Sequence, residues 1–152
     1  MASYIKSTLF GSSEKSSLSQ SNIEDSSIIK ESSHSRYKRI ISKPLEYRQE
    51  EISRIKEKYP NLVPIMVYRS PTSGAVVPDI DKTKYLAPSD LTFGQFQVVI
   101  RKRIRLEPEK ALFSFVNGSL IPTSTLLSTV YDIHKSEDGY LYIVYSGENT
   151  FG

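Results

Sequence analysis

Apolar residues at helical spacing mark the first folded element of this chain. Leu45, Ile52, Ile55 and Tyr59 fall along one side of a helix, and the residues between them are largely polar. Pro60 follows, and the residue before a proline is disfavoured in the helical conformation. The pattern therefore predicts a helix that ends at this proline.

Two strand signals come next. The run Leu62–Tyr68 is mostly apolar, and Pro64 within it favours an edge position or a strand start, because proline cannot donate a ladder hydrogen bond. A loop at Ser70–Gly74 follows, and a second strand is expected around Ile80–Ala87.

The clearest helix signal begins at Thr92. Thr92 and Gln95 have the spacing of a capping box, and Leu91 and Phe96 stand where a hydrophobic staple belongs. The apolar positions of this helix are Phe93, Phe96, Val99, Ile100 and Ile104.

The last third of the chain predicts strand, turn, short helix and strand. Ala111–Val116 has strand character, and Asn117-Gly118 is a strong hairpin signal. A short helix is expected at about Thr125–His134, and Tyr140–Tyr145 is apolar on both faces, as in a central buried strand. The order of elements indicates an α+β fold of the β-grasp type, with extra helix at its front.

Composition narrows the classes of function. A chain of 152 residues has room for one domain with a real core, and it holds no apolar run near the ~20 residues of a membrane span and no secretory signal. The absence of cysteine excludes thiol chemistry and suits the cytosol, and His34 and His134 are too few for a histidine metal cluster. The formal net charge of +3 suits an anionic membrane or acidic peptides, but is too small to indicate nucleic acid.

The two ends of the chain differ from its middle. Residues 1–34 are rich in paired serines and poor in periodic apolar residues, which predicts a disordered extension before a domain at 35–152. A phosphorylated regulatory arm and a membrane-touching segment are alternatives for this extension. At the other end, a short polar tether leads to Phe151-Gly152, and glycine lets an extended tail thread a narrow channel.

Several motifs go beyond periodicity: Lys84–Thr92, Ile100–Ile104, Ala111–Asn117, Pro44–Glu46, Lys58–Pro60 and the tail Tyr145–Gly152. Together they resemble those of the autophagy ubiquitin-like modifiers, the family of GABARAP and the microtubule-associated light-chain proteins. The resemblance covers about residues 35–152 and implies a ubiquitin-like β-grasp fold with two extra N-terminal helices. Departures from GABARAP include a longer loop at Ser70–Pro78 and Leu62 at a position that is basic there.

The resemblance implies that the chain is a conjugation substrate and not an enzyme, and that it needs no cofactor. Gly152 would be activated, passed through thioesters and joined to phosphatidylethanolamine, with the autophagy activating and conjugating enzymes and a delipidating cysteine protease as partners. Family precursors usually extend past this glycine, so Gly152 is either the encoded end or a trimmed one. The implied location is cytoplasmic, and on autophagosome or other vesicle membranes when lipidated.

The resemblance also implies capture of cargo receptors that carry an aromatic-x-x-aliphatic motif. Such a peptide would add as a strand to the edge formed by Lys82, Thr83, Lys84, Tyr85 and Leu86. The aromatic pocket would comprise Glu51, Ile55, Pro64, Lys84, Leu86 and Tyr140. The aliphatic pocket would comprise Tyr85, Ala87, Pro88, Leu91, Phe96, Val99 and Arg103.

Other interpretations remain at this stage. Leu91, Phe96, Val99 and Ile100 can be read simply as core, and the basic run 101–103 as a solvated helix face. The same fold without conjugation would be an interaction module for trafficking or cytoskeletal partners. A nucleic-acid surface built from Arg101, Lys102, Arg103 and Arg105 would bind with steep salt dependence. A hydrolase would need Asp132 and His134 together, but two residues apart on a helix they face different directions.

Overall fold

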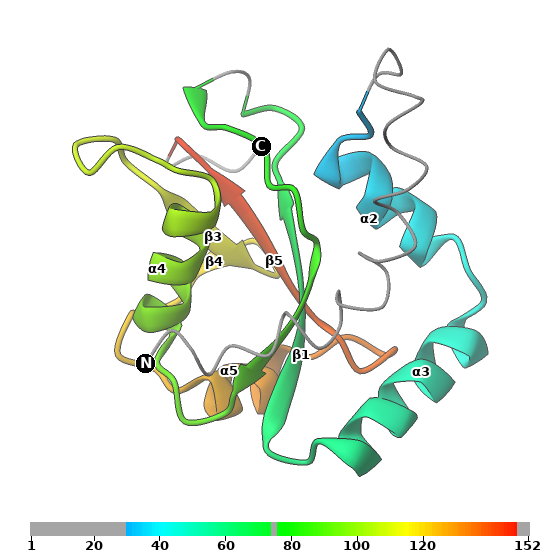
Figure 1. Ribbon diagram of the computed structural model, residues 1–152. Coiled ribbons are helices and arrows are strands. Elements are labelled where there is room, and N and C mark those ends of the chain that lie inside the picture. The colour runs from blue at the N-terminus through cyan, green and yellow to red at the C-terminus, as the bar shows by residue number, and fades with distance from the viewer. Residues whose placement is uncertain (1–29, 74–75, 149–152) are drawn as a thin grey trace, which may run out of the picture.

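The computed structural model describes residues 30–73 and 76–148, and Figure 1 shows the arrangement of the elements. The elements in chain order are α2 (Ser33–Ile41), α3 (Leu45–Lys58), β1 (Leu62–Arg69), β2 (Lys84–Pro88), α4 (Phe93–Arg103), β3 (Phe113–Val116), β4 (Ser119–Leu120), α5 (Leu127–His134) and β5 (Leu141–Ser146).

The five strands form one mixed sheet in the order β2-β1-β5-β3-β4. Strand β5 runs parallel to β1 and antiparallel to β3, so the last strand of the chain lies in the middle of the sheet. This confirms the central position expected for Tyr140–Tyr145. The α+β class and the ubiquitin-like fold with two additional N-terminal helices are likewise confirmed.

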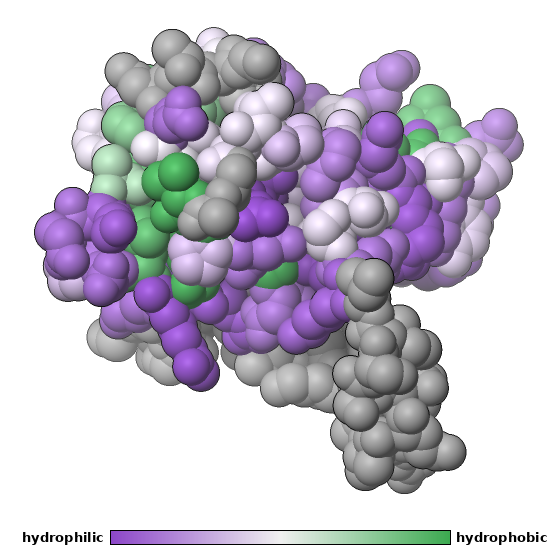
Figure 2. All heavy atoms as spheres, turned by 90° about the horizontal axis from the view of Figure 1, so that it is seen from above, coloured by the Kyte–Doolittle hydropathy of each residue, from purple (hydrophilic) through white to green (hydrophobic). Residues whose placement is uncertain are grey.

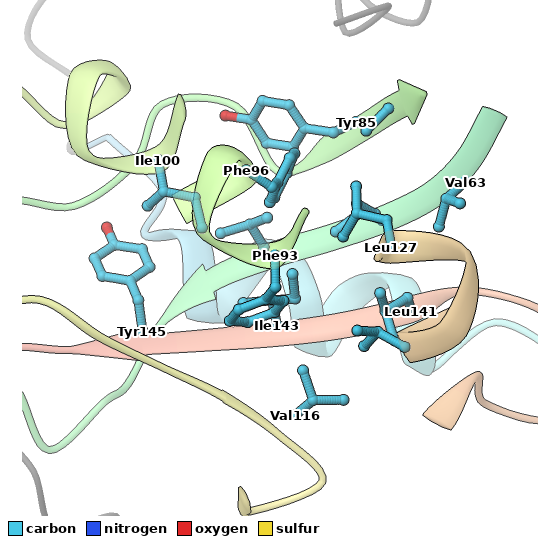
Figure 3. Packing of buried hydrophobic residues seen from close by; sticks show 14 of the residues in the cluster. Val63, Tyr85, Phe93, Phe96, Ile100, Val116, Leu127, Leu141, Ile143 and Tyr145 are labelled. Atoms are coloured by element: carbon cyan, nitrogen blue, oxygen red, sulfur yellow. The ribbon is translucent and has the colours of Figure 1, made fainter. Parts of the chain in front are cut away.

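The main core lies between one face of the sheet and the helices α4 and α5 (Figure 3). Every second residue of the strands faces these helices. Ile65, Leu141 and Ile143 are among them and belong to the same buried cluster as Phe96 of α4 and Leu127 of α5, and all five are almost fully buried. This arrangement bears out the simple core interpretation for Phe96 and Ile100.

A smaller core joins α2 and α3 to the opposite face of the sheet. It consists of Ile40, Ile52, Met66 and Tyr140, with Ile55 and Tyr142 packed against it. The backbone of Gly139, just before Tyr140, has φ +94°, and a Cβ there would lie 2.5 Å from Cγ2 of Ile52. Glycine therefore lets α3 approach the start of β5 closely.

Two local signals have the geometry that the sequence predicts. The Thr92 hydroxyl accepts a hydrogen bond from the Gln95 amide, and the Gln95 side chain accepts one from the Thr92 amide, which completes the capping box of α4. Asn117 and Gly118 have φ values of 52° and 76°, as a tight hairpin between β3 and β4 requires.

The second strand begins later than expected, at Lys84 instead of Ile80. The backbone groups of Ile80 are bonded elsewhere: its amide donates to the Asp79 carboxylate, and its carbonyl accepts from Arg36, 44 residues away. Side chains thus occupy the backbone N–H and C=O groups that would otherwise form hydrogen bonds with a neighbouring strand. Ile80 itself is buried in the main core.

Pro64 does not mark an edge strand, because β1 lies between β2 and β5. Pro64 is the third residue of β1, and pairing with β5 begins only at Ile65. The Val67 amide donates toward β2, and backbone N–H groups alternate in direction along a strand. The nitrogen of Pro64, an odd number of residues away, therefore faces β5. The missing N–H therefore falls before the ladder that would have used it.

The first described helix starts before the boundary expected at residue 35. Ser32 is the N-cap of α2, and its hydroxyl accepts a hydrogen bond from the Ser35 amide. Ser33 and His34 thus belong to the helix. Residues 1–29, most of the expected extension, lie outside the described residues.

Candidate functional site

Strand β2 lies at one end of the sheet order, with β1 as its neighbour in the described sheet. The register pairs Leu86 with Pro64 and Lys84 with Met66, and a hydrogen bond of 2.8 Å from the Val67 amide to the Thr83 carbonyl extends the pairing by one residue. The expected docking edge at 82–86 therefore overlaps the real edge strand. Lys82 lies just before it and is half-buried.

The two predicted pockets fall on opposite faces of this edge strand. Tyr85 and Ala87 point into the main core with α4, whereas Lys84 and Leu86 share the face of Met66, which packs with α2 and α3. A groove on each side of β2 would thus be bounded by a different helix.

The residues predicted for the aromatic pocket gather on the α3 side. Glu51 Oε2 and Lys84 Nζ form an ion pair of 3.0 Å, and Ile55 packs on the small core that contains Tyr140. Tyr140, Leu86 and Pro64 are buried, so they can form a floor but not a rim. The accessible part of this set consists of Glu51, Ile55 and Lys84.

Apart from Pro88, which shares the face of Lys84 and Leu86, the residues predicted for the aliphatic pocket lie on the α4 side. Tyr85 and Phe96 meet edge to face with ring centroids 5.7 Å apart, and both are buried together with Ala87. Leu91 and Val99 are partly buried and pack against this core. Pro88 is partly buried as well, and Arg103 is exposed.

An ion pair that the sequence did not reveal borders the α4 side. Arg103 Nε donates to Asp81 Oδ1 over 2.9 Å. Burial would raise the pKa of Asp81, but the hydrogen bond and charge of Arg103 outweigh it and hold that pKa below its usual value. Each side of β2 thus carries a basic side chain already joined to an acid, Lys84 with Glu51 and Arg103 with Asp81.

A separate hollow of about 320 Å³ lies on the α2 side of the sheet, farther from β2. Tyr37 and Tyr68 stack there with centroids 4.0 Å apart, and Phe115 and Tyr142 are further aromatic residues of its lining. Below it, Arg48 donates to the buried Asp138 carboxylate over 2.8 Å. Sequence patterns gave no sign of this hollow, because its residues come from five helices and strands and from two connecting segments.

The residues of the other chemical alternatives do not form a reactive site. His134 contacts Asn117 through Nδ1 and its backbone carbonyl, while Asp132 is exposed on α5. Within residues 30–73 and 76–148, no three acidic or histidine side chains are grouped as metal ligands would be. The same described part of the chain contains no helix long and apolar enough to cross a bilayer. Gly152, the expected conjugation residue, lies outside the described residues.

A mixed sheet with a parallel β1–β5 pair in the middle, one crossing helix and two added N-terminal helices defines a ubiquitin-like protein. The model of the family described as autophagy protein Atg8, ubiquitin-like, matches residues 47–152. The chain belongs to the Atg8 family.

Relatives and solved structures agree with this assignment. Autophagy-related protein 8a of Arabidopsis thaliana is 59% identical over 112 residues, which cover 74% of this chain and 90% of the relative. Autophagy-related protein 8A of Oryza sativa subsp. indica is 56% identical over 109 residues, covering 72% of this chain and 90% of that protein. The crystal structure of Trypanosoma brucei ATG8 superposes with a TM-score of 0.66 at 42% identity, covering 74% of this chain and 95% of that structure.

Proposed function

We propose that this protein is a ubiquitin-like modifier that is conjugated through Gly152 to phosphatidylethanolamine and that recruits cargo receptors during autophagosome formation. Membership of the Atg8 family supports the proposal, and the match to the family reaches residue 152. The chain itself would be a substrate of this reaction and would supply no catalysis.

The observation that carries the receptor-binding part is the position of the two pocket sets on opposite faces of an edge strand. A peptide that pairs with β2 as an added strand alternates its side chains between the two faces. Residues three apart then point to opposite faces, one toward Ile55 and Lys84, the other toward Leu91 and Val99. An aromatic-x-x-aliphatic motif has this spacing.

The size of the contact favours moderate and reversible binding. Burying an aromatic side chain of ~150–250 Å² at ~25 cal/mol per Å² contributes at most roughly 4–6 kcal/mol before the peptide is ordered. Acidic residues beside the motif would be attracted by Lys84 and Arg103, although each already has an acidic partner.

Conjugation would follow the chemistry of a carboxylate. The Gly152 carboxylate attacks ATP to give an acyl-adenylate and pyrophosphate, and an enzyme thiol then displaces AMP. The amine of phosphatidylethanolamine displaces that thiol, leaving an amide. Two acyl chains anchor a protein stably, whereas one binds only marginally, so the product moves from the cytoplasm to autophagosome or vesicle membranes. A cysteine protease that cuts the amide would return it.

The experiment that tests the docking geometry compares peptides that differ in spacing alone. Calorimetry is run with acid-flanked aromatic-x-x-aliphatic and aromatic-x-aliphatic peptides of equal composition. We expect the first to bind at least about tenfold more tightly, because the second places both anchors on one face. Equal affinities would overturn docking along β2. Binding without any conjugation of Gly152 would instead support a ubiquitin-like interaction module for trafficking or cytoskeletal partners.

A further inference from the structure

The end of the last strand is held by the loop between β1 and β2. The Ser70 amide donates to the Tyr145 carbonyl and the Tyr145 hydroxyl donates to the Pro78 carbonyl, each over 2.8 Å. One residue further, Ser73 Oγ lies 3.4 Å from Ser146 Oγ, and it accepts the Gly147 amide at 3.3 Å. Ser73, Tyr145 and Ser146 are nearly inaccessible to solvent, so these contacts are packed and not incidental.

Gly147 passes close to the loop, where an added Cβ would force a neighbouring side chain to move. A Cβ at Gly147 would lie 2.9 Å from Cγ1 of Val76 and 3.1 Å from Cγ1 of Val77. Among the described glycines positive φ occurs at Gly118 and Gly139, so the requirement at Gly147 is space and not backbone conformation. Val77 is fully buried, whereas Val76 is 57% exposed and can be truncated without opening the core.

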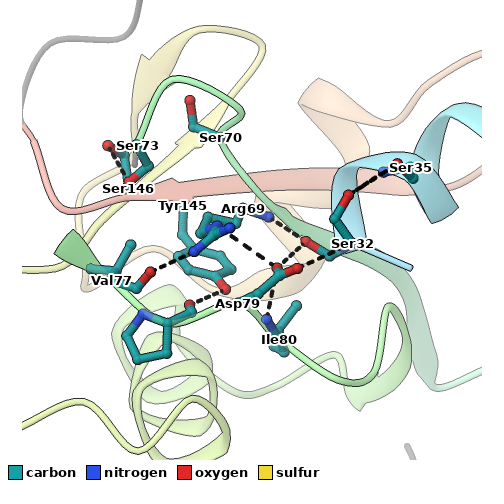
Figure 4. A network of polar contacts seen from close by, with 12 residues as sticks. Ser32, Ser35, Arg69, Ser70, Ser73, Val77, Asp79, Ile80, Tyr145 and Ser146 are labelled. Atoms are coloured by element: carbon teal, nitrogen blue, oxygen red, sulfur yellow. Dashed lines mark hydrogen bonds and ion pairs between the residues drawn. The ribbon is translucent and has the colours of Figure 1, made fainter. Parts of the chain in front are cut away.

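The loop is itself fastened to the rest of the fold (Figure 4). Arg69 donates to the Val77 carbonyl over 2.8 Å, and the Asp79 carboxylate accepts the amides of Ser33 and Ile80, each over 2.9 Å. The part of the loop from Val77 to Asp79 is therefore anchored to β1 and to the start of α2. Seen from the end of the molecule where β5 finishes, a group of apolar side chains interrupts a mostly polar surface (Figure 2).

We infer that Ser73, Val76 and Val77 form a clasp that positions the root of the C-terminal tail for the activating enzyme. The inference rests on the proposed conjugation at Gly152 and assigns positioning residues to it. The longer loop expected at Ser70–Pro78 supplies all three residues of the clasp.

The clasp fixes the point from which the tail starts, and so limits the distance that the Gly152 carboxylate can reach. The five residues from Glu148 to Gly152 span at most about 18 Å when extended. Holding Gly147 removes freedom that a loose tail would have to lose on entering an enzyme channel. Opening the clasp therefore weakens engagement of the tail and leaves the adenylation step itself unchanged.

The test is a double-mutant cycle in which the kinetics of adenylation and the amide exchange near Gly147 are measured. Adenylation of the full chain by the family's activating enzyme is measured for wild type, Gly147→Ala, Val76→Ala and the double variant, with amide exchange of Ser146 and Glu148 followed by NMR. Gly94→Ala is the matched control, because a Cβ there would also lie 2.9 Å from a neighbouring carbon, that of Thr123, far from the tail in sequence.

We expect Gly147→Ala to raise KM about 3- to 10-fold with kcat unchanged and to speed exchange at both amides, the effect of losing about one hydrogen bond and its packing. Val76→Ala in the same chain removes the closer of the two contacts but leaves the 3.1 Å approach to Val77, so KM should fall to a value between those of wild type and Gly147→Ala. Gly94→Ala leaves KM unchanged.

Two results would overturn the positioning role alone. One is a Gly147→Ala protein that reacts like wild type; the other is a double variant as slow as Gly147→Ala, which would place the clash in the enzyme channel. A wild-type protein that is not adenylated at all would overturn the proposed conjugation and the positioning role together.

Discussion

Glu51 of α3 and Lys84 of β2 form an ion pair of 3.0 Å at the edge where a receptor peptide is proposed to dock. The Lys84 and Glu51 side chains are 23% and 29% exposed, so solvent screens the pair only in part. Its importance is for binding, because an acidic residue of the peptide would be attracted by Lys84 and repelled by Glu51.

Reversing the charge of Lys84 tests this electrostatic role. We expect Lys84→Glu to weaken an acid-flanked peptide at least about tenfold, since it sets like charges against each other, and Glu51→Gln to strengthen it about twofold. Calorimetry at two salt concentrations measures both effects. Lys110→Glu makes the same charge change on an exposed loop residue, and an equal loss there would contradict a local role for Lys84.

Two adjacent valines on α4 differ in burial and together test the predicted aliphatic pocket. Val99 is partly buried against the core and belongs to the predicted aliphatic pocket, whereas Val98 is 49% exposed. Val99→Ala should lower peptide affinity about two- to fivefold, through the loss of apolar contact, with a stability loss near 1 kcal/mol. Val98→Ala is expected to change neither affinity nor the urea midpoint; similar losses in both variants would remove the pocket from this face.

The ion pair of Arg48 with Asp138 should matter for stability far more than the exposed pairs. Asp138 is 1% exposed and also accepts hydrogen bonds from the Tyr142 hydroxyl and the Tyr140 amide. Asp138→Asn is expected to lower the unfolding free energy by about 3 kcal/mol, because it leaves a largely buried guanidinium without its counter-charge.

The control for this effect is Arg54→Met, which removes an i,i+4 pair with Glu50 whose side chains are 77% and 69% exposed. Its expected change is under about 0.5 kcal/mol. Urea unfolding of both variants measures the contrast, and equal losses would contradict the role given to burial.

Asp79 should make stability depend on pH at the acid end. Burial would raise its pKa, but hydrogen bonds from Ser33 and Ile80 and the charge of Arg69 lower it below the usual value. A group with a lowered folded pKa stabilises the fold above its unfolded pKa, about 3.9, and that contribution is lost as the pH falls through the folded pKa.

The comparison of wild type with Asp79→Asn tests this linkage. Wild type is expected to be more stable by a constant amount between about pH 5 and 7, with the difference shrinking below about pH 4. Asp90→Asn, on an exposed turn residue, should follow wild type throughout. A difference between wild type and Asp79→Asn that persists undiminished at low pH would contradict the linkage.

Local chemistry could be predicted from the sequence, and distant contacts could not. The Thr92 and Gln95 capping box and the Asn117-Gly118 hairpin depend on residues a few positions apart, so their spacing was enough. The start of β2 was misplaced because Arg36 takes the Ile80 carbonyl from 44 positions away. The pairing of Arg103 with Asp81 and the passage of Gly147 beneath Val76 likewise leave no periodic pattern.

The candidate site shows the same division. Resemblance assigned Glu51, Lys84, Leu91 and Val99 to two pockets at one edge strand, and in the fold the first two lie on the α3 side of that strand and the last two on the α4 side. The sequence did not show which pocket residues are buried and which are accessible to a peptide. The burial of Tyr140, Leu86 and Phe96 depends on how α3 and α4 pack against the sheet.

The measurement that tests the central claim most directly is reconstituted conjugation followed by intact mass. The full chain is incubated with the family's activating and conjugating enzymes, ATP and phosphatidylethanolamine liposomes, beside a chain that lacks Gly152. The account predicts that wild type gains the mass of the lipid less one water and that the deletion gains none. An unchanged wild-type mass, while an established modifier reacts in the same mixture, would contradict it.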